Sequence, residues 1–327
     1  MRDEIPPTAT PIPPGGLRLL QVIEYPAWEL VHTSAWSADG AWLAVSAGET
    51  VYVYDGAALQ PRPALHIGAW ASGLAFAPPG SSASLLALAA RDGSIQLWDV
   101  STGQQRASFF GHKKGANSVS FSPDGLLLAS TGNDALVRLW DLSGFWAALE
   151  SGRLDGVTIP QQADMIGGAF AVPVVRFSPD GSLVASVDLQ AIRLRDPAST
   201  RLVRTLHGET SVFSITFSPD GQYLAAAEMG ATLRVWQVAS GEQAAAWQAA
   251  EDPKTFLWSA AFSADGSRLA AVSSRGWVYL WSFPAGHPLA AFQGHARAAS
   301  AVSFSPDGRW LVTGGLDAQV KVWELPK

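Results

Sequence analysis

The sequence predicts an all-β protein in which seven copies of a small antiparallel sheet close into a ring. Three observations predict it. A turn motif recurs seven times along the 327 residues, and a strand-like hexad follows every copy. The chain is also 48% apolar and only 15% charged, which excludes a disordered protein and supports a large buried core.

The turn motif consists of an aromatic residue, two small or proline residues, and Asp-Gly or a close variant. Its copies are WSADG from Trp36, FAPPG from Phe76, FSPDG from Phe121, Phe177, Phe217 and Phe304, and FSADG from Phe262. Successive copies are 40, 45, 56, 40, 45 and 42 residues apart. A repeat of this length is typical of solenoids and propellers.

The hexads are strand-like and rich in valine, leucine, isoleucine and aromatic residues. They are VYVYDG ending at Gly56, IQLWDV at Val100, VRLWDL at Leu142, IRLRDP at Pro197, LRVWQV at Val238, VYLWSF at Phe283 and VKVWEL at Leu325. The fourth hexad position follows the aromatic residue of its turn by 18 or 19 residues, or by 22 in the second copy. The two markers therefore belong to one structural unit.

Each unit has a simple physical reading. Proline presets φ near −65° and the final glycine can adopt a positive φ, so Ser-Pro-Asp-Gly forms a tight reversal between two strands. A second turn containing Asp or Gly leads into the hexad. Both faces of the resulting sheet are apolar, so neighbouring units must stack, and the right-handed twist of about seven sheets closes a ring.

These residues resemble the WD-repeat family of β-propellers, with seven blades of four antiparallel strands. The similarity covers residues 17–325 and includes Gly111-His112, Trp98-Asp99, Trp140-Asp141 and Gly294-His295. The last unit has only three strands of its own. The resemblance implies that the amino-terminal strand LRLLQVI, residues 17–23, completes that blade and closes the ring.

One propeller domain is therefore expected over 17–327, preceded by a flexible Pro- and Thr-rich tail at 1–16. The 56-residue spacing indicates an insertion within about 143–171, where Phe145, Trp146 and Leu149 have helical spacing. Such an insertion can contribute to a binding face or can simply be tolerated. The sequence does not decide between these alternatives or say on which face it lies.

Two sets of polar residues have the spacing of the hydrogen-bonded tetrad of the family. The sets are His112, Ser130, Asp134 and Trp140, and His295, Thr313, Asp317 and Trp323. Ser, His and Asp also suggest a hydrolytic triad. We favour a structural role because the set occurs twice, no G-x-S-x-G motif accompanies it, and mutual hydrogen bonding accounts for all four residue types.

Several functional classes are disfavoured. The absence of cysteine excludes disulfides, cysteine-ligated metals and thiol nucleophiles. The six histidines occur singly and no phosphate-binding glycine loop is present, so neither a metal nor a cofactor is expected. A net charge of −6 and the absence of a long apolar run argue against nucleic acid and direct membrane insertion.

The expected function is a non-enzymatic scaffold that binds a protein or peptide on its top face. Positions carried over from the family are Trp28, Leu30, Trp70, Arg91, Lys113, Asn133, Asp188, Glu209, Ser211, Met229, Lys254 and Phe256. Exposed aromatic and charged side chains of this kind anchor partners. The alternatives are a sensory propeller with a small ligand in the central channel and, less favoured, a hydrolase using channel carboxylates.

A monomer in the cytoplasm is expected, or an extracytoplasmic protein if the chain is a fragment of a longer one. The many Ala and Arg with few Lys and Asn suggest GC-rich coding and a bacterial source.

Overall fold

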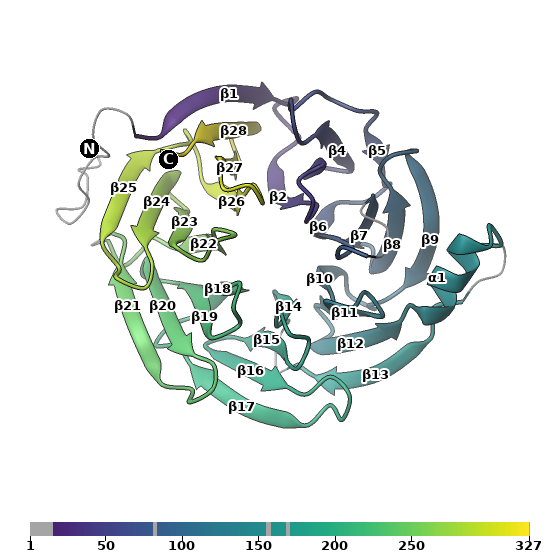
Figure 1. Cartoon of the computed structure of the whole chain (residues 1–327). Helices are drawn as coiled ribbons and strands as arrows, with labels where there is room; N and C mark the ends of the chain where they lie inside the picture. The colour runs from purple at the N-terminus through teal and green to yellow at the C-terminus, as the bar shows by residue number, and fades with distance from the viewer. Residues whose placement is uncertain (1–15, 81–83, 155–157, 168–170, 251, 327) are drawn as a thin grey trace. The chain divides into compact units, whose positions relative to one another are not determined.

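The computed structural model describes residues 16–80, 84–154, 158–167, 171–250 and 252–326. Almost every element in these ranges is a β-strand, and the strands form four-stranded antiparallel sheets, or blades (Figure 1). We number the blades in chain order, so that blade 1 begins with β2 and blade 7 begins with β26.

The strands of blades 1 to 4 are β2 (Val31–Trp36), β3 (Trp42–Ala47), β4 (Thr50–Asp55) and β5 (Leu65–His66); β6 (Ala71–Phe76), β7 (Leu85–Ala90), β8 (Ser94–Asp99) and β9 (Gln104–Phe110); β10 (Ala116–Phe121), β11 (Leu127–Gly132), β12 (Leu136–Asp141) and β13 (Gln161–Ile166); and β14 (Val175–Phe177), β15 (Val184–Asp188), β16 (Ala191–Arg195) and β17 (Leu202–His207).

The strands of blades 5 to 7 are β18 (Val212–Phe217), β19 (Tyr223–Glu228), β20 (Thr232–Gln237) and β21 (Gln243–Gln248); β22 (Leu257–Phe262), β23 (Arg268–Ser273), β24 (Trp277–Ser282) and β25 (Pro288–Gln293); and β26 (Ala299–Phe304), β27 (Trp310–Gly315) and β28 (Gln319–Glu324) with β1 (Arg18–Glu24).

The amino-terminal strand completes the last blade, as predicted. The order of that sheet is β1-β28-β27-β26, and β1 pairs antiparallel with β28 from Arg18 opposite Glu324 to Glu24 opposite Gln319. At one end of this pairing the Arg18 guanidinium donates two hydrogen bonds to one carboxylate oxygen of Glu324. The predicted fold class, a seven-bladed β-propeller of four-stranded antiparallel blades, is confirmed.

The chain forms two compact units, Met1–Ser34 with Gly208–Lys327 and Ala35–His207. In each unit the core lies where neighbouring blades face one another. In the first unit, apolar side chains of blades 5 and 6 share one cluster and those of blades 6 and 7 share another. In the second unit, shared clusters join blades 1 and 2, blades 2 and 3, and blades 3 and 4. Each sheet thus buries its apolar faces against its neighbours, as a repeat that is unstable alone must.

The helical spacing after blade 3 produces helix α1 (Ser143–Glu150). Its Phe145 is fully buried in the cluster shared by blades 2 and 3, and the Trp146 indole donates to the carbonyl oxygen of Gly125 at 2.8 Å. Gly125 ends the Ser-Pro-Asp-Gly turn of blade 3. The helix therefore lies beside that turn, at the end of blade 3 opposite Lys113 and Asn133. The predicted tail lies outside the described residues apart from Gly16.

Candidate interaction site

The tetrad residues of blade 3 form one buried chain of hydrogen bonds. His112 Nδ1 is 2.8 Å from Asp134 Oδ1, and His112 Nε2 is 2.8 Å from Ser130 Oγ. The Trp140 indole donates to the same Ser130 oxygen at 2.8 Å. His112 and Ser130 are completely inaccessible to solvent.

This arrangement is suited to structure and unsuited to nucleophilic attack. Burial lowers the pKa of His112 in spite of the hydrogen bond with Asp134, so the ring is neutral at pH 7. A neutral ring with its proton on Nδ1 donates to Asp134 and accepts the Ser130 hydroxyl proton at Nε2. Both ring nitrogens and the hydroxyl are then engaged, and no substrate can reach the serine oxygen.

Asp134 also accepts a hydrogen bond from Arg138, a residue that no sequence motif had marked. Arg138 Nη1 lies 2.8 Å from Asp134 Oδ2 and 2.8 Å from His112 Nδ1. The Arg138 N–H donates to the Asp134 carboxylate and not to His112, because His112 Nδ1 already carries a proton. Burial alone would raise the pKa of Asp134, but the hydrogen bonds from Arg138 and His112 outweigh it and lower the pKa to about 2.

Blade 7 repeats the same chain. His295 lies 2.9 Å from Asp317 through Nδ1 and 2.9 Å from Thr313 through Nε2, and Trp323 donates to Thr313 at 3.0 Å. Burial acts to raise the pKa of Asp317, but the hydrogen bond with His295 contributes to a net lowering. Two blades therefore carry equivalent buried networks, and neither forms an open cleft.

Other blades replace the tetrad with different polar pairs. In blade 2 the Trp98 indole donates to Gln96 at 2.9 Å, since Leu88 occupies the hydroxyl position. In blade 5 the buried Arg234 donates to the buried Glu228 at 3.0 Å and to the exposed Glu209 at 3.2 Å. Burial raises the pKa of Glu228 in spite of the bond from Arg234. No sequence motif marks these pairs, because each is specific to its own blade.

The predicted partner-binding residues of the second unit are mostly exposed and polar. Arg91, Lys113 and Asn133 are exposed, whereas Trp70 and Asp188 are half-buried. The Arg91 guanidinium stacks on the Trp70 ring, with the guanidinium carbon 5.3 Å from the ring centre. Asp188 is held by Arg193 at 2.6 Å. Apolar anchors are therefore scarce among these five residues.

The predicted partner-binding residues of the first unit are more apolar. Trp28 is 77% exposed and Met229 is 37% exposed, and Glu209 and Lys254 are exposed as well. Leu30, Ser211 and Phe256 are half-buried. A single antiparallel bridge joins Met229 to Phe256, which brings the turn of blade 5 beside the start of blade 6.

Phe256 belongs to an aromatic cluster with Phe213 and Trp258. The ring centres are 5.6 Å apart for Phe213 and Phe256, 4.7 Å for Phe213 and Trp258, and 6.0 Å for Phe256 and Trp258. Rings at these distances are in contact with one another. The space between them is therefore too small to bind a cationic group. Trp258 is nevertheless 37% exposed, so the cluster presents an apolar surface.

Sequence reasoning missed Phe213 and Trp258 because a β-bulge places them. In the first strands of blades 5 and 6 the register shifts at these two residues. The same shift falls on Asn117 in blade 3 and Ser300 in blade 7. A bulge redirects its side chain and is often found at functional sites. The recurring turn motif would have located this position by counting four residues back from its aromatic residue.

At the bulges of blades 3 and 7, the polar side chain bonds the backbone where the next blade begins. Asn117 donates to the carbonyl oxygen of Val172 at 3.1 Å, and Ser300 donates to that of Val31 at 2.5 Å. An aromatic ring cannot make this bond. At the same bulge, blades 5 and 6 therefore have an aromatic side chain in place of a polar side chain that links neighbouring blades.

The described residues contain no group of three or more His, Asp or Glu side chains placed to hold a metal ion. None of their helices has the length and apolar character needed to cross a bilayer.

The architecture and its buried networks define a repeat protein of the propeller class. The family model of the WD domain, G-beta repeat, matches residues 103–141, 200–237 and 286–324. Each match begins at or just before the outer strand of one blade and ends at the third strand of the next. Three stretches of this seven-bladed β-propeller therefore match WD40 repeats.

The chain is also similar to parts of known proteins. The chain is 31% identical to nuclear distribution protein PAC1 of Arthroderma otae over 51% of this chain and 40% of that protein. It is 33% identical to apoptotic protease-activating factor 1 of Danio rerio over 34% of this chain and 9% of that protein. It is 25% identical to small ribosomal subunit protein RACK1y of Oryza sativa over 52% of this chain and 48% of that protein.

The match thus spans less than half the length of each of these relatives. They come from a fungus, a fish and a plant, and so lend no support to the bacterial source expected from composition.

Proposed function

We propose that this chain is a non-enzymatic interaction module that binds a protein or peptide partner through Phe213, Met229, Phe256 and Trp258. Trp258 carries the proposal. It occupies a bulge at which blades 3 and 7 have polar residues that bond the next blade, and it remains 37% exposed. A few residues carry most of the binding free energy of a protein interface, and tryptophan is enriched among them.

The surroundings of the cluster support this role. Met229 is fixed by its backbone, whose N–H donates to Ser211 and whose carbonyl accepts from Thr210 at 2.7 Å. Phe256 is fixed by a bond from its N–H to Ser274. Apolar side chains on a preorganised backbone lose little conformational entropy on binding. WD-repeat relatives named for nuclear distribution and for a ribosomal subunit are consistent with a scaffold role.

The test is the substitution Trp258→Ser, which installs the residue that blade 7 has at the same bulge. The protein and the variant serve as baits for affinity purification with quantitative mass spectrometry, and affinities are then measured with the purified partner. We expect a melting temperature within about 2 °C of the unsubstituted protein and a loss of affinity of roughly 30-fold.

Trp28→Ser is the matched control, because it removes an exposed tryptophan of the same unit that lies outside the cluster. It should retain the partner. Equal capture by Trp258→Ser and the unsubstituted protein would refute the proposed surface. The proposal also includes a monomeric state and a cytoplasmic location. From the net charge of −6 we infer in addition that the chain does not bind nucleic acid.

A further inference from the structure

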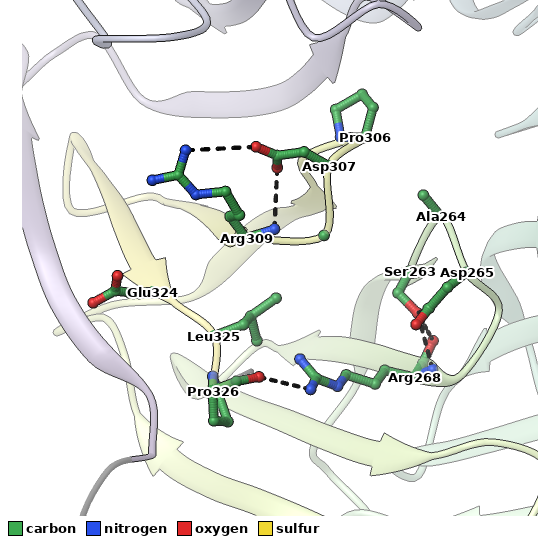
Figure 2. Close-up of a pocket in the computed structure, with 11 residues that line it drawn as sticks. Ser263, Ala264, Asp265, Arg268, Pro306, Asp307, Arg309, Glu324, Leu325 and Pro326 are labelled. Atoms are coloured by element: carbon green, nitrogen blue, oxygen red, sulfur yellow. Dashed lines mark hydrogen bonds and ion pairs between the residues drawn. The ribbon is translucent and has the colours of Figure 1, made fainter.

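A second site lies in the first unit, at the opposite end of the strands that carry the aromatic cluster. A cavity of about 310 Å³ opens between the turn after β22 and the turn after β26, beside the end of β28 (Figure 2). Trp258 lies near the start of β22 and Ser263 follows its end, so the cavity is roughly 17 Å from the cluster along the strand.

At this cavity blade 6 has Ala264 where most blades have a proline. Where one blade has Ser-Pro-Asp-Gly, the proline packs beside the turn glycine of the next blade. A Cβ placed on Gly181 would lie 3.3 Å from Cδ of Pro123, and one placed on Gly266 would lie 3.6 Å from Cδ of Pro219. Blade 6 has Ala264, and a Cβ on Gly308 of blade 7 would meet nothing within 4 Å.

Blade 1 shows the same relation in the second unit. Its turn contains Ala38, and a Cβ on Gly80 of blade 2 would also meet nothing within 4 Å. In the two pairs of neighbouring blades with a proline, the space beside the turn glycine of the second blade is therefore filled. In the two pairs with an alanine, it is open. The turn that contains Ala264 has the same backbone geometry as the proline turns. Its Gly266 N–H donates to Ser263 at 2.9 Å, as Gly125 N–H does to Ser122 in blade 3, so backbone strain is not the reason for the alanine.

The walls of the cavity combine apolar surface with two guanidinium groups. Leu325 lies between the side chains of Arg309 and Arg268 in Figure 2, and Pro306 and Pro326 also line the space. Arg268 uses one N–H to bond the carbonyl oxygen of Pro326 at 2.8 Å. The rest of its donor fork is available to a ligand.

The Arg309 guanidinium also has only a long ion pair. Its guanidinium is 3.9 Å from Asp307, beyond hydrogen-bond distance, and lies over the Trp310 ring with its carbon 5.2 Å from the ring centre. The ring orients the guanidinium without using its N–H groups.

The carboxylates around the cavity already have donors. Asp265 accepts from the Ser263 hydroxyl at 2.6 Å and from the N–H and hydroxyl of Ser267. Asp307 accepts from the Ser305 hydroxyl and from the Arg309 N–H. Glu324 is held by Arg18 at 2.7 Å. Each of these carboxylates thus has at least one donor of its own, whereas the Arg268 and Arg309 guanidinium groups keep N–H groups without a side-chain hydrogen bond.

We propose that this cavity binds a small ligand with an apolar body and a single carboxylate. The carboxylate is held by the Arg309 guanidinium, and the apolar body rests on Leu325 and the two prolines. A cavity of this volume is at the lower end of the range for small-molecule sites. Arginine is well suited to hold a carboxylate because its planar fork can donate two parallel bonds.

The test is an NMR titration that follows the backbone amide of Gly308. The probes are benzoate, benzylamine and benzyl alcohol, which share one apolar body and differ in charge. We expect benzoate to shift the Gly308 signal with a dissociation constant on the order of 1 mM. Benzylamine and benzyl alcohol should bind at least about tenfold more weakly.

Two variants locate the binding, and one serves as their control. Ala264→Pro adds two methylene groups beside Gly308 and should weaken benzoate binding roughly fivefold or more. Arg309→Gln should weaken it roughly tenfold. Ala38→Pro makes the same change in blade 1 and should leave benzoate binding unchanged. Melting temperatures at or above that of the unsubstituted protein are expected for both proline variants, which verifies folding.

Three results would overturn the proposal. They are an unshifted Gly308 amide at about 20 mM benzoate, equal weakening by Ala264→Pro and Ala38→Pro, and benzylamine binding as tightly as benzoate. None of these results depends on a macromolecular partner, so the cavity and the aromatic surface can fail separately.

Discussion

Ser130 shows how much a single polar residue can contribute inside a blade. Its oxygen accepts from Trp140 while its hydroxyl satisfies His112, and both of its partners are almost fully buried. A hydrogen bond contributes little net stability, but a buried donor or acceptor left without a partner is costly. Removing this hydroxyl strands two groups at once.

Ser130→Ala should therefore lower the free energy of unfolding by about 2 to 4 kcal/mol. Ser186→Ala is the matched control, because Ser186 occupies the same register position in blade 4 and is equally buried. Its partner there is Arg195, at a long 3.4 Å, and Arg195 keeps a second bond to Ile166. We expect the control to cost less than half as much in urea denaturation. Equal costs would show that the hydrogen-bonded chain adds nothing.

Residues of the two kinds of site differ in how far sequence predicts them. His112 and its partners were found because their spacing is set by strand and turn lengths that recur in every blade. Phe213 and Trp258 were not, since a bulge shifts the register by one residue and turns a side chain to another face. Arg138 and Arg234 were missed for a different reason. Arg138 adds a bond to a complete tetrad and Arg234 forms an ion pair in a blade that lacks one, and only the neighbouring residues determine these contacts.

At the scale of elements, the strands follow the sequence closely except in blade 1. Its outer strand β5 has only two residues, paired at Thr50 with His66 and Val51 with Leu65. Pro61 and Pro63 precede it in the sequence and have no N–H to donate to β4. The strand is therefore short for a reason that is visible in the sequence.

Hydrogen exchange should reflect this difference between blades. Amides of β12 and β28 lie between two full strands in blades that carry a complete tetrad, whereas β4 has a partner of two residues on its outer side. We expect β12 and β28 to exchange slowest and β4 to exchange faster by roughly tenfold or more. Slower exchange in β4 than in β12, measured by mass spectrometry on the intact protein, would contradict this ranking.

At the scale of the whole molecule, one pairing between distant parts of the sequence completes the repeat pattern. The WD40 match at 286–324 ends with β28, and the fourth strand of that blade comes from the opposite end of the chain. The six other blades take all their strands from one stretch. The backbone edge of β28 would be exposed without β1, and exposed edges favour aggregation. This arrangement was predictable from the sequence because the last unit lacks one strand and a spare strand precedes the first.

Two truncations test what this pairing contributes to stability. Deletion of residues 1–25 removes β1, its ion pair with Glu324 and the bond from Tyr25 to Ala318, and it exposes the edge of β28. We expect the melting temperature to fall by roughly 5 °C or more. Deletion of residues 1–15 removes only a Pro- and Thr-rich segment whose composition predicts no packing, so its melting temperature should be unchanged. Differential scanning calorimetry of the two proteins decides the question: equal melting temperatures would mean that the amino-terminal strand does not hold the last blade.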